Sequence, residues 1–103
     1  MPSPPHCLHL VFPADLEEAV SAALIEHQPP LSGFTLLKAE GHSNDFATAS
    51  PDERVRGRVA RRVILMVQPL ETIEAIITML RTRVRSERVV WWTTRIEHFG
   101  RLK

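Results

Sequence analysis

The chain has 103 residues, of which 44% are apolar and 24% charged, with a net charge of +1 at neutral pH. This length and composition are typical of one globular domain that can bury a core without cross-links. The small net charge argues against a general binder of nucleic acids or membrane surfaces, since such proteins carry a strong basic excess. We therefore expect a single domain spanning residues 1–103 that binds no nucleic acid.

Two features of the sequence bear on the compartment. The only cysteine, Cys7, cannot form an internal disulfide framework, which favours a reducing environment. The longest apolar run, residues 63–67, is far shorter than the roughly 20 residues that a membrane helix needs. We expect a cytoplasmic protein with no membrane insertion.

The first half of the chain predicts a strand, a helix and a second strand. Residues 6–12 alternate between two faces, as in a strand, and Pro13 ends the run. Residues 14–27 place apolar side chains at helical spacing, and the Pro29-Pro30 pair terminates that helix. Residues 34–40 then form the second strand.

The second half predicts the same plan. Residues 59–68 read as a strand whose centre, 63–67, is apolar without alternation, so we expect both of its faces to be covered. Residues 71–84 have one apolar helical face, and residues 89–94 are rich in residues that favour strands.

The two halves can be aligned with each other. Residues 7–13 match 63–69 and residues 14–20 match 70–76, with a strand, a proline and a helix in each copy. Two such units in the order β-α-β-β-α-β predict an α+β, ferredoxin-like sandwich. It would have a four-stranded antiparallel sheet with two helices on one face.

The second face of that sheet is expected to be apolar. It would carry Cys7, His9, Val11 and one member of the Trp91-Trp92 pair, because adjacent strand residues point to opposite faces. Exposed apolar patches of this kind mark interfaces. We therefore expect an oligomer closed through its sheets with cyclic symmetry.

Residues 41–58 connect the halves without any apolar period. Connections longer than about 12–15 residues are uncommon in small domains and are usually functional. Arg56, Gly57 and Arg58 at the end of this loop are its best anion candidates, because two guanidinium forks beside a glycine suit a phosphate. The alternative is a set of ion pairs with the carboxylates of Asp52 and Glu53.

Metal and catalytic signals are weak in this sequence. His42, at the start of the loop, is the candidate metal ligand, since neutral imidazole is a common donor; the alternative is a hydrogen bond to the loop backbone. The sequence has no Cys-x-x-Cys or His-x-x-x-His spacing. It also offers no recognisable nucleophile with an acid-base partner, so we expect no enzymatic activity.

Four stretches carry a resemblance to a known family: Gly41-His42-Ser43, Glu53-Arg54-Val55-Arg56-Gly57-Arg58, Trp91-Trp92 and Phe99-Gly100-Arg101-Leu102. The chain resembles an uncharacterised bacterial family that is grouped with the PII and CutA proteins and often accompanies heavy-metal efflux systems. The resemblance implies a trimer in which residues 41–58 correspond to the regulatory T-loop, beside clefts between subunits that bind nucleotides in many relatives. The chain departs from PII proteins in having no tyrosine, and no Gly-Asp-Gly-Lys turn at residues 82–88.

We thus expect a PII-like regulatory or sensory homotrimer. Its ligand would be a nucleotide, another anion or a divalent metal ion held near the loop, and its partner a transporter or a regulator. The expected ligand-binding residues are Gly41, His42, Ser43, Arg56, Gly57 and Arg58. A CutA-like trimeric metal-binding protein is one alternative. A single-stranded RNA module is another, disfavoured because residues 59–68 include no aromatic side chain for base stacking.

Overall fold

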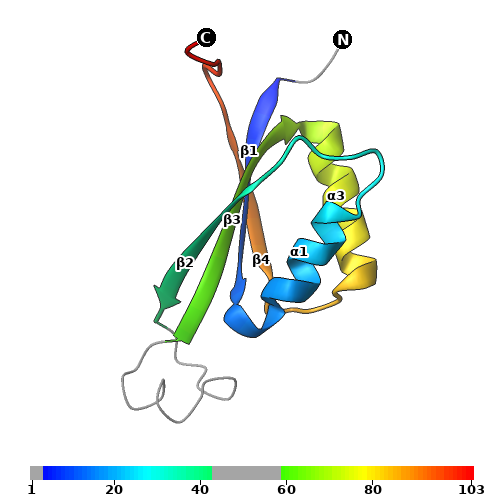
Figure 1. Cartoon of the computed structure of the whole chain (residues 1–103), viewed down its shortest axis with the longest axis vertical. Helices are drawn as coiled ribbons and strands as arrows, with labels where there is room; N and C mark the ends of the chain where they lie inside the picture. Colours follow the sequence, from blue (N-terminus) through cyan, green and yellow to red (C-terminus); the bar gives the residue numbers. More distant parts are fainter. Residues whose placement is uncertain (1–3, 43–58) are drawn as a thin grey trace.

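The computed structural model describes residues 4–42 and 59–103. The elements are β1 (Pro5–Pro13), a 3-10 helix η1 (Ala14–Leu16), α1 (Glu17–Ile25), β2 (Thr35–Gly41), β3 (Val59–Pro69), α3 (Leu70–Arg83) and β4 (Val90–Arg95). The strands form one sheet in the order β2-β3-β1-β4, and every neighbouring pair is antiparallel. Both helices cover the same face (Figure 1). This confirms the predicted α+β, ferredoxin-like fold.

The first helix is shorter than its apolar pattern predicts. Residues 14–16 form the 3-10 turn, and α1 ends at Ile25, so that His27 lies beyond it. The residue before a proline is disfavoured in helical conformation, which requires the chain to unwind before Pro29. The ring of His27 is instead buried, and its Nδ1 donates a hydrogen bond to the carbonyl oxygen of Pro29 at 3.0 Å.

The core lies between the sheet and the two helices. Its strand members are Leu8, Leu10, Phe12, Ile64 and Met66, and its helix members are Val20, Ala23, Leu24, Ile73, Ile76, Ile77 and Leu80. The strand register explains why these strand residues form the core. Leu10 lies opposite Ile64 on one side and Trp91 on the other, and all three are on the helix-covered face. Within the described residues, neither helix is long and apolar enough to cross a membrane.

The other face of the sheet carries the expected apolar side chains. His9 lies between Leu65 and Trp92, so the two tryptophans point to opposite faces, as predicted. The side chains of Trp92 and Leu37 remain 45% and 46% exposed. Residues 4–42 and 59–103 therefore cover only one face of β3, so the expectation that both faces are covered is not met within this part of the chain.

Candidate functional site

Two of the six predicted ligand-binding residues lie in the described part of the chain. Gly41 is the last residue of β2 and pairs with Val59, the first residue of β3. His42 follows and is exposed. Ser43, Arg56, Gly57 and Arg58 lie outside the described residues. The connection thus leaves and re-enters the sheet at paired positions, at the end opposite to where β4 finishes (Figure 1).

Gly41 makes room for an arginine side chain at this point. A Cβ atom built on Gly41 would lie 1.9 Å from Nε and 3.0 Å from Cζ of Arg61. The Arg61 side chain therefore crosses directly over the Gly41 backbone, which no residue with a side chain would allow. Because Arg61 pairs with Ala39, it lies on the face of the sheet that the helices leave open.

Arg61 has no ion-pair partner among residues 4–42 and 59–103. The residue as a whole is half-buried at the base of the connection. Planar guanidinium groups bind carboxylates and phosphates through paired hydrogen bonds. The residue was not among those predicted from sequence, although a glycine diagonally across a hairpin from an arginine is a signal for such a contact once the register is known.

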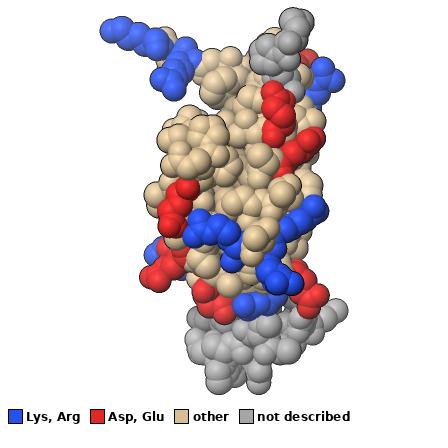
Figure 2. All heavy atoms as spheres, turned by 90° about the vertical axis from the view of Figure 1, so that its right-hand side faces the viewer, with Lys and Arg blue, Asp and Glu red and all other residues tan. Residues whose placement is uncertain are grey.

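Three other arginines form ion pairs within the chain: Arg62 with Glu17, Arg83 with Glu26 and Arg88 with Asp15. The predicted alternative of ion pairs with Asp52 and Glu53 concerns residues outside the described part of the chain. Arg62 follows Arg61 in β3 and so points to the opposite, helix-covered face, where it reaches the first turn of α1. Figure 2 shows acidic and basic side chains side by side over the half of the helix face nearest this end.

The described residues contain no group of three or more His, Cys, Asp or Glu side chains able to hold a metal ion. Two donors do lie close together on the open face, where Sγ of Cys7 is 3.9 Å from Nε2 of His9. His42 follows β2 at the end of the sheet where Gly41 pairs with Val59, and it is not brought to this pair. A metal site would therefore need further donors.

Comparison with known proteins identifies a matching family and similar solved structures. A family model described as "Protein of unknown function (DUF3240)" matches residues 2–103. The crystal structure of a DUF3240 family protein from Shewanella baltica OS155 superposes with a TM-score of 0.76 and 23% identity, covering 98% of this chain and 99% of that one. None of the curated proteins compared shows a significant sequence match.

A second structure links the fold to PII-like proteins. CPII, a nitrogen regulatory PII-like protein from Thiomonas intermedia K12 solved with ADP, AMP and bicarbonate, has a TM-score of 0.68. It is 16% identical to this chain, and the match covers 94% of each. The chain therefore has the PII-like form of the ferredoxin-like fold.

Proposed function

Because the chain belongs to the DUF3240 family of proteins of unknown function, we propose its role from its PII-like fold and its own site. We propose that it is a cytoplasmic, non-enzymatic regulatory or sensory homotrimer that binds a small anion between subunits at the base of residues 41–58. The observation that carries this proposal is Arg61, whose guanidinium lies over Gly41 without a carboxylate partner in the described part of the chain.

Assembly through the open face is supported by what that face exposes. Trp92, Leu37 and Val90 are 45%, 46% and 54% exposed, and they are apolar. Contiguous apolar surface on a small protein favours association. A second and a third copy covering this face would leave Arg61 at the edge of a cleft between subunits, because Arg61 lies on the same face.

The expected ligand chemistry follows from the donors. Arg61 and the adjacent His42 would contact an anion through side chains, with Ser43, Arg56, Gly57 and Arg58 completing the proposed site. Residues 82–88 lack glycine, so phosphate groups would not be held there by bare backbone amides. The relative CPII was solved with ADP, AMP and bicarbonate, which makes these anions the first ligands to test.

Isothermal titration with ADP, AMP and bicarbonate tests the proposal, with light scattering to measure the subunit number. Arg61→Gln is expected to weaken binding by about tenfold or more, since one charged hydrogen bond is lost. Gly41→Ala is the sharper variant, because it keeps every charge but displaces the Arg61 side chain. Arg83→Gln removes an ion-paired arginine at the end of α3, on the helix side of the sheet, and serves as control.

A monomer in solution would overturn the assembly part of the proposal. Binding that is equal in wild type, Arg61→Gln and Gly41→Ala would overturn the site, as would failure of the wild type to bind any of the three anions. Either of these two binding results would mean that Arg61 is not the ligand contact.

The pair formed by Cys7 and His9 supports a second candidate, a CutA-like trimeric metal-binding protein with a role in heavy-metal efflux beside a transporter or its regulator. Thiol and imidazole donors suit copper and zinc. Titration with copper, zinc and nickel ions separates the two functions. Loss of metal binding in His9→Ala would locate the site on the open face, whereas loss in His42→Ala would locate it on the connection.

A further inference from the structure

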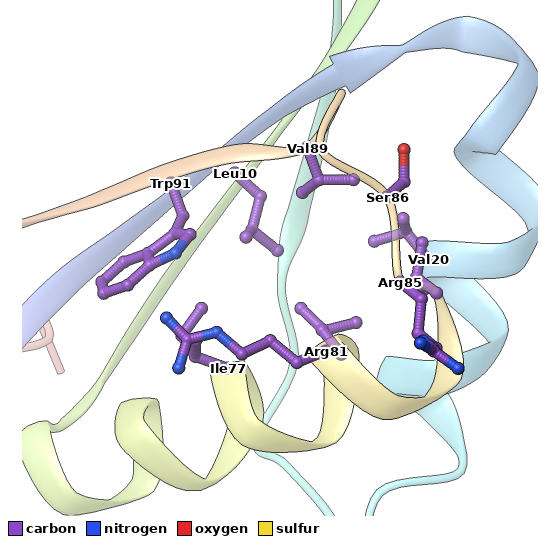
Figure 3. A pocket seen from close by; sticks show the side chains of 10 residues that line it. Leu10, Val20, Ile77, Arg81, Arg85, Ser86, Val89 and Trp91 are labelled. Atoms are coloured by element: carbon purple, nitrogen blue, oxygen red, sulfur yellow. The ribbon is translucent and has the colours of Figure 1, made fainter.

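A pocket of about 330 Å³ lies on the helix-covered side of the sheet, between the end of α3 and the start of β4 (Figure 3). Its floor is apolar and includes the core residues Leu10 and Ile77. Trp91 forms one wall, and Arg81 and Arg85 line opposite sides of the pocket. An apolar cavity of this size with a few polar groups is the usual form of a small-molecule site.

The arginines near the end of α3 differ in whether they form an ion pair. Arg83 and Arg88 form ion pairs with Glu26 and Asp15, and neither lines the pocket. Arg81 and Arg85 do line it, and within the described residues neither has a carboxylate partner. Figure 3 shows Arg81 extending from α3 toward the side of the pocket that Trp91 occupies. Two guanidinium groups without a carboxylate partner in the described residues thus line this cavity.

Arg85 adopts a backbone conformation that is unfavourable for its residue type. Its φ is 49°, in the left-handed region, directly after the helix cap Val84, and its N–H donates to the carbonyl oxygen of Leu80 at 3.2 Å. Glycine usually occupies this position because a Cβ atom is strained there. Strain that the fold could relieve with glycine is a feature of functional sites.

Trp91 adds an aromatic surface to the same cavity. It lies opposite Leu10 on the edge strand β4, with 42% of its surface exposed although it faces the helix side. An indole at this position offers a flat apolar wall for a ring. The pocket therefore combines a wall for a ring with two cationic groups in its lining.

We propose that this pocket binds a small organic anion with an aromatic body, an aryl carboxylate or an aryl phosphate. The ring would lie on the apolar floor beside Trp91. The side chains of Arg81 and Arg85, which Figure 3 shows directed apart, would turn to donate hydrogen bonds to the anionic group. This site is separate from the Arg61 site, since Arg61 and Leu10 lie on opposite faces of the sheet. It lies within one subunit and needs no second copy.

The test uses 1-naphthoate and 1-naphthyl phosphate as probes, with neutral 1-naphthamide and inorganic phosphate as controls. Calorimetry should show saturable binding of at least one aryl anion, with one site per chain. The amide should bind more weakly by about tenfold or more. Inorganic phosphate alone should not bind measurably. Comparing the two anions tells a carboxylate ligand from a phosphate ligand. In the Trp92→Phe variant, fluorescence reports on Trp91 alone.

Variants then test the assigned residues. Arg81→Gln and Arg85→Gly should each weaken binding by about tenfold, whereas Arg83→Gln and Arg61→Gln should leave it unchanged. Arg85→Gly should also raise the Tm by roughly 4 °C or more, because it removes the strained Cβ. Gain of stability with loss of binding is a combination that a purely structural role of Arg85 would not produce.

Three results would overturn this proposal: no saturable binding of either aryl anion, equally tight binding of the neutral amide, or unchanged affinity in both Arg81→Gln and Arg85→Gly. If Arg61→Gln abolished aryl-anion binding as well, the two sites would not be separate. If the wild type bound aryl anions but none of ADP, AMP and bicarbonate, only the function proposed for the Arg61 site would be rejected.

Discussion

His9 and Trp92 are stacked across β1 and β4, with ring centroids 5.0 Å apart and ring planes inclined by 10°. The pair lies on the open face of the sheet. Nδ1 of His9 is buried and has no hydrogen-bond partner within the described residues. A buried nitrogen without a partner costs free energy, so the stacking of His9 on Trp92 is kept despite this cost.

The first prediction concerns this pair in the proposed oligomer. Trp92→Ala removes the largest side chain of the open face together with its stacking on His9. Central aromatic residues of an interface contribute about 2 kcal/mol or more, so the concentration at which subunits dissociate should rise by roughly 30-fold or more. Light scattering over a dilution series measures this shift.

Trp91→Ala is the matched control, because Trp91 is similarly exposed but faces the helix side. It should leave dissociation unchanged while weakening the binding of aryl anions. If Trp92→Ala dissociated at the same concentration as the wild type, the open face would not be the surface that joins the subunits.

The second prediction concerns the core under α3. Ile76 is fully buried between the sheet and the helices. Ile76→Ala should lower the free energy of unfolding by about 2–5 kcal/mol, from the lost burial and the cavity left behind. Urea unfolding at one fixed protein concentration measures the loss, because stability in an oligomer depends on concentration.

Ile25→Ala provides the comparison, since Ile25 on α1 is 72% exposed in the subunit. Its effect should stay within about 0.5 kcal/mol. A loss of 2 kcal/mol or more in Ile25→Ala would mean that this end of α1 is buried in the assembled protein. A small effect in Ile76→Ala would contradict the packing of α3 against the sheet.

The fold could be predicted because its signals are local. The sequence alternation predicts that Leu8, Leu10 and Phe12 share one face, and all three are buried in the structure. The structure also contains the predicted repeat of a strand, a proline and a helix. The end of α1 was misplaced because the apolar spacing continues to His27, while the geometry imposed by Pro29 ends the helix earlier.

The sites were less accessible to such reasoning because they depend on register. The contact of Arg61 with Gly41 joins residues 20 positions apart and follows only from the pairing of β2 with β3. The sequence likewise shows a cluster of arginines near the end of α3 without showing which of them are paired. The backbone conformation of Arg85 has no signal in composition, since glycine is the residue expected there.

The last prediction compares two ion pairs by their burial. The side chains of Arg62 and Glu17 are 19% and 36% exposed, whereas those of Arg83 and Glu26 are 43% and 56% exposed. Exposed pairs contribute about 0.2–1 kcal/mol, so double-mutant cycles with glutamine should give a coupling of about 1 kcal/mol for the first pair and about 0.3 kcal/mol for the second.

Urea unfolding in low salt and in 0.5 M sodium chloride (about 4 Å of screening length) measures both couplings. Added salt should remove most of the coupling between Arg83 and Glu26, because exposed charges are screened, and less of that between Arg62 and Glu17. Equal couplings with equal salt dependence would contradict the packing of Arg62 between β3 and the first turn of α1. That packing determines which residues of β3 face the helices. It places Arg62 under the helices and leaves Arg61 on the open face.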